Sequence, residues 1–287
     1  MIVFTDLHLH TTFSDGTYSP EELAAEAKRF GLVAVALTDH DTVEGCVRMR
    51  AACDASSIEF IPATELTCEV GRVELHMLGY FLDVANPKLL LQMARFQKGR
   101  QDRIREIVAR LQKLQVPLRE EDVFGIANCK SPGRPHVARA LIQRKVCASV
   151  DEAFERFLKK NRPGWVPKEK ITAQEALDLI HQAGGLAVVA HPGLARTEEA
   201  LPELIEAGVD GIECFHTKHS PSASEYYVSL AEKHDLVITG GSDCHGMNKG
   251  KPLIGSIKLP YQYVRDLKGR LRNGHPAKTA NGQNSAE

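Results

Sequence analysis

Three features that would point to particular classes of protein are missing from this 287-residue sequence. No apolar run approaches the ~20 residues that a membrane-spanning helix needs, so we expect no membrane partner. Lys and Arg (36) balance Asp and Glu (37), which argues against the basic surface of proteins that form stable nucleic-acid complexes. The seven cysteines contain no Cys-x-x-Cys pair, and their odd number gives no sign of a disulfide framework.

The N-terminal residues also lack the charged, apolar and cleavage regions of a secretory signal peptide, so we expect a cytoplasmic protein. The composition is that of an ordinary globular chain, with 43% hydrophobic and 25% charged residues. A chain of this length buries about 75% of its unfolded surface, and its core can therefore be large. Nothing in the sequence indicates an oligomeric state.

Apolar segments of strand length alternate with helical patterns over much of the chain. Strands are expected at residues 2–9, 32–37, 58–62, 73–78, 186–190, 209–215 and 236–239. After the first of them, Ser19 and Pro20 are typical of a helix start, and Gly31 is typical of its end. Because residues 32–37 are apolar throughout, as in strands buried on both faces, the pattern predicts an α/β fold with a parallel barrel or a doubly wound sheet.

The middle of the chain breaks this alternation. Ile104, Ile107, Val108 and Leu111 form one helical stripe, and further helical patterns follow it. We therefore predict a helical insertion at residues 98–167 that caps the active site, within a barrel formed by residues 1–97 and 168–272. The polar residues 273–287 are expected to be a disordered tail.

Imidazoles and carboxylates follow the predicted strands. On the first strand, His8 and His10 are two residues apart and should share one face, with Leu7 and Leu9 on the other. In α/β barrels the carboxyl ends of the strands carry the chemistry. The complete group is His8, His10, Asp15, His40, Glu65, His76, His191, Asp243 and His245.

Nine such side chains exceed the three or four ligands of one tetrahedral zinc site, so they suggest several ions with shared ligands. A carboxylate such as Glu65 can bridge two ions, and a donor set without thiolate suits manganese, iron or zinc. The alternative is that several of the nine are structural. Ser242, beside Asp243, lacks the Gly-x-Ser-x-Gly setting of a serine hydrolase.

The ordered motifs resemble the PHP (polymerase and histidinol phosphatase) family. They are His8-Leu9-His10, Ser14-Asp15-Gly16, Thr38-Asp39-His40-Asp41, Glu65, His76, Ala190-His191-Pro192 and Ser242-Asp243-Cys244-His245. The resemblance implies a distorted (β/α)7 barrel with a small helical insertion domain. It also implies three divalent ions, manganese first with iron or zinc as alternatives, and hydrolysis of phosphate esters by a metal-bridging hydroxide.

Carried over by position, the resemblance divides the ligands among three ions. The first set is His8, His10, Glu65 and Asp243, the second is Glu65, His76 and His191, and the third is Asp15, His40 and His245. Asp15 stands where some family members carry histidine. The expected catalytic residues are Glu65, Asp243 and His245.

The predicted insertion and its Gly133-Arg134-Pro135-His136 motif resemble the stand-alone branch of the family. That branch includes 3′,5′-nucleoside bisphosphate phosphatases and 5′-to-3′ exoribonucleases of the RNase AM type, so the expected partner is a nucleotide or short oligonucleotide. Arg134, Arg196 and His219 are the expected substrate-binding residues, because guanidinium and imidazole groups bind phosphate oxygens. Two alternatives stay open: a phosphomonoesterase like histidinol phosphatase, and an inactive metal-bound scaffold.

Overall fold

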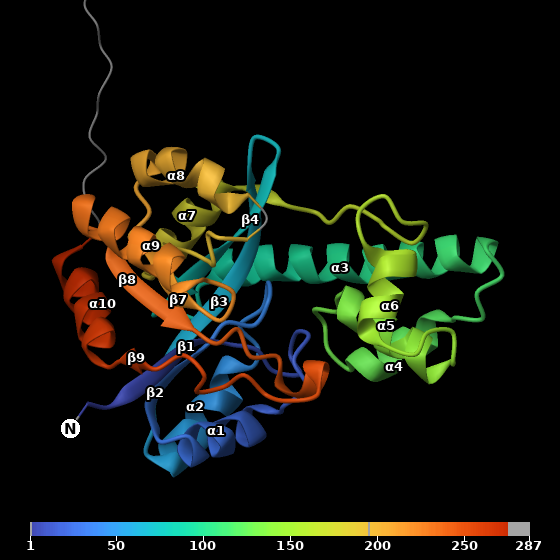
Figure 1. The fold of residues 1–287 in the computed structure, drawn as a ribbon, viewed down its shortest axis with the longest axis horizontal. Coiled ribbons are helices and arrows are strands. Elements are labelled where there is room, and N and C mark those ends of the chain that lie inside the picture. Colours follow the sequence, from blue (N-terminus) through green and yellow to red (C-terminus); the bar gives the residue numbers. More distant parts are fainter. Residues whose placement is uncertain (1, 195, 275–287) are drawn as a thin grey trace, which may run out of the picture.

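The computed structural model describes residues 2–194 and 196–274 (Figure 1). Most of the predicted tail, from residue 275 to residue 287, lies outside these described residues. The strands are β1 (Phe4–Leu9), β2 (Leu32–Leu37), β3 (Glu59–Val70), β4 (Val73–Tyr80), β5 (Ile171–Thr172), β6 (Leu186–Val189), β7 (Gly211–His216), β8 (Val237–Gly241) and β9 (Leu259–Pro260). No helix in the described ranges is long and apolar enough to cross a membrane.

The helices lie on the outside of the sheet or in a separate helical body (Figure 1). The α-helices are α1 (Pro20–Arg29), α2 (Cys46–Ser56), α3 (Pro87–Lys113), α4 (Glu120–Ala127), α5 (Arg134–Gln143), α6 (Val150–Ala153), α7 (Ala173–Gln182), α8 (Leu201–Ala207), α9 (Pro221–Lys233) and α10 (Gln262–Asn273). Shorter helices are the π-helix η1 (Phe154–Leu158) and the 3₁₀ helices η2 (Thr197–Ala200) and η3 (Gly246–Lys249).

The strands form a nearly closed barrel, as the predicted fold class requires. Their order is β8-β7-β6-β4-β3-β2-β1-β9, and a bridge between Leu9 and Cys244 brings β1 against the chain that leaves β8. Apolar residues from alternate strand positions fill the interior, and α10 adds Val264 and Leu267 to the same cluster. Within it, the buried Tyr80 hydroxyl donates to the Leu7 carbonyl oxygen at 2.9 Å.

The prediction of a parallel sheet is wrong at two strands, β9, which pairs antiparallel with β1, and β4. β4 is antiparallel to both of its neighbours, β3 and β6. β3 does not end near residue 62 but continues to Val70, and Gly71, with φ of +55°, turns the chain into β4. Because positive φ suits glycine, a tight hairpin forms where we expected a strand end. Glu65 therefore lies within a strand.

The sequence predicts that Leu7 and Leu9 share one face of β1 and that His8 and His10 share the other, and only the second half of this prediction holds. Leu7 packs in the interior cluster, whereas Leu9 packs in the outer cluster with the helices. The pairing of β1 with β2 shifts register between Asp6 and Leu9, which breaks the strict alternation of faces. The rings of His8 and His10 nevertheless stay neighbours, with their centroids 5.1 Å apart.

Local sequence explains the first helix. The Ser19 side chain accepts from the Glu22 backbone N–H, and Glu22 accepts from the Ser19 N–H in return. Pro20 then occupies the first turn, where its missing N–H costs nothing. The helix start predicted from Ser19 and Pro20 is confirmed.

Helix α3 connects the barrel to the helical body that Figure 1 shows in green and yellow-green. It starts at Pro87, capped by the Asn86 side chain, and runs without a break through residue 98, where our predicted insertion begins. The far half of α3 belongs to a second hydrophobic core, whose buried members run from Ile104 to Val166. We keep the name insertion for residues 98–167.

Candidate metal centre

Glu65 is surrounded by five imidazoles. Its Oε2 lies 3.3 Å from Nε2 of His8, 3.4 Å from Nε2 of His10 and 3.1 Å from Nδ1 of His40. Its Oε1 lies 2.7 Å from Nδ1 of His76 and 3.0 Å from Nε2 of His191. A carboxylate with imidazoles on both oxygens has the arrangement that a bridging ligand needs.

A second carboxylate, Asp243, faces the same imidazoles from the chain that follows β8. Its Oδ1 lies 3.2 Å from Nε2 of His10 and 3.6 Å from Nε2 of His8. The same oxygen lies 3.4 Å from Nδ1 of His245. Asp243 adopts φ of +52°, an unusual conformation for a residue other than glycine, and such conformations are concentrated at functional sites.

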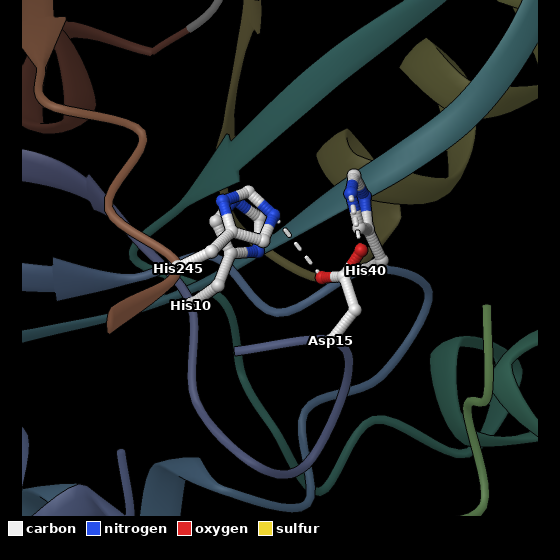
Figure 2. A group of neighbouring side chains, drawn as sticks. All are labelled: His10, Asp15, His40 and His245. Carbon is white, nitrogen blue, oxygen red and sulfur yellow. Dashed lines mark ion pairs between the residues drawn. The ribbon is translucent and has the colours of Figure 1, made fainter. Parts of the chain in front are cut away.

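Asp15 comes from the turn after β1 and closes the opposite side of the group. Its Oδ1 lies 3.1 Å from Nε2 of His245, and its Oδ2 lies 4.0 Å from Nε2 of His40. Figure 2 shows these side chains and His10 pointing toward one another from separate segments of the chain. The Asn248 amide donates to the Asp15 carbonyl oxygen at 2.8 Å and so connects this turn to η3.

The structure brings all nine predicted residues together. They form four overlapping groups whose ligand atoms lie within 4.8 Å of one another. The groups are His10, Asp15, His40 and His245; His8, His10 and Asp243; His8, Glu65 and His191; and His40, Glu65 and His76. Overlapping groups indicate a centre with shared ligands and not one isolated site.

The spacing of these groups fits divalent ions. Two ligand atoms that each lie about 2.1 Å from one ion are roughly 3.0–3.4 Å apart at octahedral or tetrahedral angles. The contacts of Glu65 with His8, His10 and His40 fall in this range. Both nitrogens of His10 and Nδ1 of His40 are buried without a well-aligned hydrogen bond to any described residue, so an ion there would satisfy otherwise unpaired atoms.

The protonation states also suit cations. Burial opposes ionisation of Glu65, yet the imidazoles around it, His40 foremost, hold the pKa of its carboxyl well below the usual range. Burial lowers the pKa of His40 and of His76, which favours neutral imidazole. Although burial opposes it, Asp15 and Asp243 raise the pKa of His245 to about 10. Carboxylates that attract a proton this strongly also attract a metal ion.

Sequence reasoning missed Glu213 on β7, and it considered His216 only as a candidate for substrate binding and not as part of the centre. Glu213 is fully buried, and its carboxylate contacts Nδ1 of His8 at 2.9 Å. Nε2 of His216 is buried and lies 3.5 Å from Oδ2 of Asp243. A usable signal was present, because a glutamate inside an apolar parallel strand is costly unless it has a partner.

Three further aspartates hold the loops that carry the candidate ligands. Asp39 accepts from the Thr11 N–H at 2.8 Å and from the Ser14 hydroxyl at 2.6 Å, and so fixes the loop after β1. Asp6 accepts from the Ser242 N–H at 2.8 Å, next to Asp243. Asp41, which follows His40, forms a buried ion pair with Arg100 of α3. The ion pair between Asp41 and Arg100 therefore connects the loop that carries His40 to α3.

The three predicted substrate residues lie in different surroundings, and Arg134 is the one that belongs to the insertion. Arg134 is partly buried at the start of α5, and its Nη1 donates to the Leu158 carbonyl oxygen at 3.1 Å. Arg196 is exposed and pairs with Glu199 at 2.6 Å. His219 lies beside His216 and contacts two backbone groups, the Cys214 carbonyl oxygen and the Gly193 N–H. The structure groups neither Arg196 nor His219 with Arg134.

A cluster of cationic side chains adjoins the centre at His76. Nζ of Lys168 lies 3.2 Å from Nε2 of His76. Burial, with Arg134 and Arg100 nearby, lowers the pKa of Arg103 to about 9. We call Arg100, Arg103, Arg134 and Lys168 the basic cluster. Arg100 pairs with Asp41, and Lys168 lies 3.4 Å from Glu74, so the unbalanced positive charge lies on Arg103 and Arg134 and favours a bound anion.

The insertion also contacts the centre directly. The Ser131 hydroxyl donates to the His40 carbonyl oxygen at 2.6 Å. On α5, Nε and Nη2 of Arg139 are buried without a hydrogen-bond partner among the described residues, and Asp15 is close enough to affect the pKa of Arg139. These contacts support the predicted capping position of the insertion, while its exact boundaries stay a prediction.

A nearly closed α/β barrel with histidines and carboxylates gathered at the ends of its strands defines a protein built to hold metal ions. Comparison with known proteins agrees with this class. The PHP domain family matches residues 6–207, and the chain belongs to this family.

Relatives align over most of their own length. The 5′-3′ exoribonuclease Rnm of Salmonella typhimurium is 32% identical over 250 residues, covering 85% of each chain. The 3′,5′-nucleoside bisphosphate phosphatase of Chromobacterium violaceum is 30% identical over 266 residues, covering 87% of this chain and 90% of the relative. A solved Bifidobacterium adolescentis structure, for which metal-dependent phosphoesterase activity has been proposed, is 31% identical with a TM-score of 0.86, covering 95% of this chain and 97% of that one.

Proposed function

We propose that this protein hydrolyses nucleotides that carry a 5′-phosphate, by breaking the bond between phosphorus and the 3′ oxygen. It is a metal-dependent phosphoester hydrolase, as its family and relatives indicate. One relative is named for 3′,5′-nucleoside bisphosphates and another for 5′-3′ exoribonuclease activity. The same bond cleavage accounts for both, because each reaction can release a nucleoside 5′-phosphate.

The observation that carries this proposal is the basic cluster beside the metal centre. A nucleotide with two phosphates needs one site where phosphorus is attacked and a second site that holds the other phosphate. Lys168 contacts His76, so the basic cluster lies directly beside the metal centre. Arg134 is its member on α5, and guanidinium binds phosphate through two parallel hydrogen bonds. We therefore assign the 5′-phosphate to the basic cluster.

The nine residues of the centre would hold the ions, in the three sets that the resemblance implies. Divalent ions there would neutralise the phosphoryl oxygens and lower the pKa of bound water from 15.7 toward about 7. The donor set contains no thiolate and suits manganese, with iron or zinc as alternatives. We propose three ions because the donors extend beyond the imidazoles that Glu65 and Asp243 share. His76 and His191 face Glu65, whereas His245 faces Asp15 and Asp243.

The proposed role of each residue follows from its position in the centre. Glu65, with imidazoles on both oxygens, would bridge two ions and fix their separation. Asp243 and His245 would lie on the side of the centre where the scissile phosphate binds, because both residues line the cavity that opens beside the centre. Water supplies the oxygen that attacks phosphorus, and the departing 3′ oxygen takes up a proton. We propose no covalent intermediate with the protein.

Both alternatives from the sequence fit the site less well. A substrate with a single phosphate, as for histidinol phosphatase, would leave Arg103 and Arg134 without an anionic partner among the described residues, since only Arg100 and Lys168 pair with carboxylates. An inactive scaffold would not need to keep nine donors together in overlapping groups. Neither alternative explains why Arg103 and Arg134 gather with Lys168, which contacts His76 of the centre.

The test compares substrates that differ only in the 5′-phosphate. Phosphate release from adenosine 3′,5′-bisphosphate and from adenosine 3′-monophosphate is measured with manganese present. A charged hydrogen-bonded contact is worth ~1.5–3 kcal/mol, so kcat/KM should be roughly 10- to 150-fold higher for the bisphosphate. Histidinol phosphate should react no faster than the monophosphate. Equal kcat/KM for all three substrates would contradict the proposal.

A further inference from the structure

A cavity of about 530 Å³ opens from the metal centre between the insertion and the loops after β7 and β8. Asp15, Asp243 and His245 line it where it meets the centre. This volume is within the range of cavities that bind small ligands. The basic cluster adjoins the centre at His76, so the cavity and the cluster meet the centre at different residues.

The insertion contributes an aromatic ring to this cavity. Phe154 and Val150 line it from the insertion, and Leu253 lines it from the barrel. The guanidinium carbon of Arg134 lies 5.5 Å from the centre of the Phe154 ring. An aromatic ring supported by arginine and flanked by aliphatic side chains is a common platform for an unpaired base.

The barrel contributes positive charge. Lys218, from the loop after β7, and Lys251, which follows η3, both line the cavity and are exposed. Lys159, which also lines it, forms an ion pair with Glu155. In the described part of the chain, Lys218 and Lys251 have no such carboxylate partner, so their charge is available to a bound anion. Lysines beside a stacking platform are typical of grooves for single strands.

We propose that this cavity binds the second nucleotide of a 5′-phosphorylated oligoribonucleotide. Its base stacks on Phe154, and Lys218 and Lys251 attract the phosphodiester that follows it. The inference rests on the proposed function, in which the 5′-phosphate occupies the basic cluster and the scissile phosphate occupies the metal centre. A nucleoside bisphosphate ends at the scissile phosphate and leaves the cavity empty, whereas RNA continues into it.

The decisive experiment measures two substrates on one variant. Lys218→Ala/Lys251→Ala is assayed on adenosine 3′,5′-bisphosphate and on a 5′-phosphorylated penta-adenylate, across a series of salt concentrations. For the pentanucleotide, log kcat/KM should fall less steeply with log salt, by about 0.7 for each phosphate that the two lysines no longer neutralise. For the bisphosphate, both kcat/KM and its salt dependence should stay within twofold of the wild type.

A second variant tests the stacking platform. Phe154→Leu keeps an apolar side chain under Arg134 but removes the aromatic face. Loss of stacking on one base should lower kcat/KM for the pentanucleotide about 5- to 150-fold and leave the bisphosphate nearly unchanged. Lys113→Ala/Lys233→Ala, at two exposed positions outside the cavity, is the charge-matched control.

The outcomes separate this inference from the proposed function. Equal losses on both substrates, or no loss on the pentanucleotide in either variant, would overturn the assignment of the cavity. An equally large change in the salt dependence of kcat/KM in Lys113→Ala/Lys233→Ala would also overturn the assignment, because the effect would then come from net charge. A wild-type protein that hydrolyses the bisphosphate but not the pentanucleotide would overturn the inference alone. Inactivity on both substrates would overturn the proposed function.

Discussion

Oε1 of Glu213 lies 2.9 Å from Nδ1 of His8, and both side chains are completely buried. The contact makes Nδ1 the protonated nitrogen and leaves Nε2 free to face Glu65 and Asp243. The other oxygen of Glu213 accepts from the backbone N–H of His191 at 2.8 Å. One carboxylate therefore orients two candidate ligands from strand β7.

Replacing Glu213 should weaken metal binding more than folding. Loss of a carboxylate that orients a metal-bound histidine typically costs 10–100-fold in metal affinity or activity. We expect Glu213→Gln to raise the dissociation constant for manganese by this factor, measured by titration of metal-free protein. Wild-type protein should bind two to three equivalents.

The control is Glu232→Gln, at an exposed position of helix α9. It should bind manganese like the wild type. Thermal melting of each protein in chelator separates the two effects, because a purely structural role for Glu213 would lower Tm without a selective change in affinity. Unchanged affinity in Glu213→Gln would contradict the orienting role.

The bridging role of Glu65 gives a sharper prediction. Both oxygens of Glu65 face imidazoles. Replacing the carboxylate by a neutral amide would therefore remove the negative charge that both ions would face. We expect Glu65→Gln to lower phosphate release from adenosine 3′,5′-bisphosphate by more than 100-fold, because even orienting residues cost 10–100-fold. Circular dichroism should show an intact fold. A variant that keeps a tenth of wild-type activity would show that Glu65 does not bridge.

Sequence patterns could locate the metal centre because most of its donors interrupt apolar strands at their ends. His40 and His191 each follow a strand of aliphatic residues, Asp243 follows strand β8, and parallel strands bring such ends to one edge. Glu213 escaped notice because it lies inside its strand, where only the cost of burying a charge could reveal it. His216 was visible in the sequence, but its approach to Asp243 depends on the packing of β7 against β8.

The antiparallel hairpin could not be predicted by the same route. Residues 63–70 contain polar and apolar side chains in nearly equal measure, which resembles a loop as much as a strand. Residues 63–70 of β3 pair with β4 only because Gly71 reverses the chain, and that pairing places Glu65 and His76 beside each other. Periodicity identifies strands, whereas the direction of a neighbouring strand depends on long-range contacts.

Arg100 should stabilise the junction between α3 and the barrel. Its Nε and Nη2 lie 2.8 and 2.6 Å from Oδ2 of Asp41, and the pair is almost completely buried. Removing one partner of a buried pair costs about 3–5 kcal/mol, because the other charge stays buried and unpaired. We expect Arg100→Met to reduce the free energy of unfolding by this amount, measured by urea denaturation.

An exposed ion pair between the insertion and the barrel, Lys130 with Glu44, provides the control. Nζ of Lys130 lies 2.6 Å from Oε1 of Glu44, and the lysine side chain is 65% exposed. Solvent screens such pairs, so Lys130→Met should change the free energy of unfolding by less than about 1 kcal/mol. Equal effects of the two substitutions would mean that burial does not strengthen the contact between Arg100 and Asp41.

Arg134 provides the test of how the substrate is recognised. If its guanidinium holds the 5′-phosphate, Arg134→Ala should lower kcat/KM on adenosine 3′,5′-bisphosphate by roughly 10- to 150-fold, the value of ~1.5–3 kcal/mol for a charged contact. The generic monoester p-nitrophenyl phosphate has no second phosphate, so its kcat/KM should change little. The ratio of the two losses is the decisive quantity, because a folding defect or loss of metal would reduce both equally. Arg196→Ala is the matched control, since Arg196 pairs with Glu199 at the surface and the structure places it outside the basic cluster. Equal losses on both substrates for Arg134→Ala would remove it from the phosphate site, and the second phosphate would then have to be held by Arg100, Arg103 or Lys168.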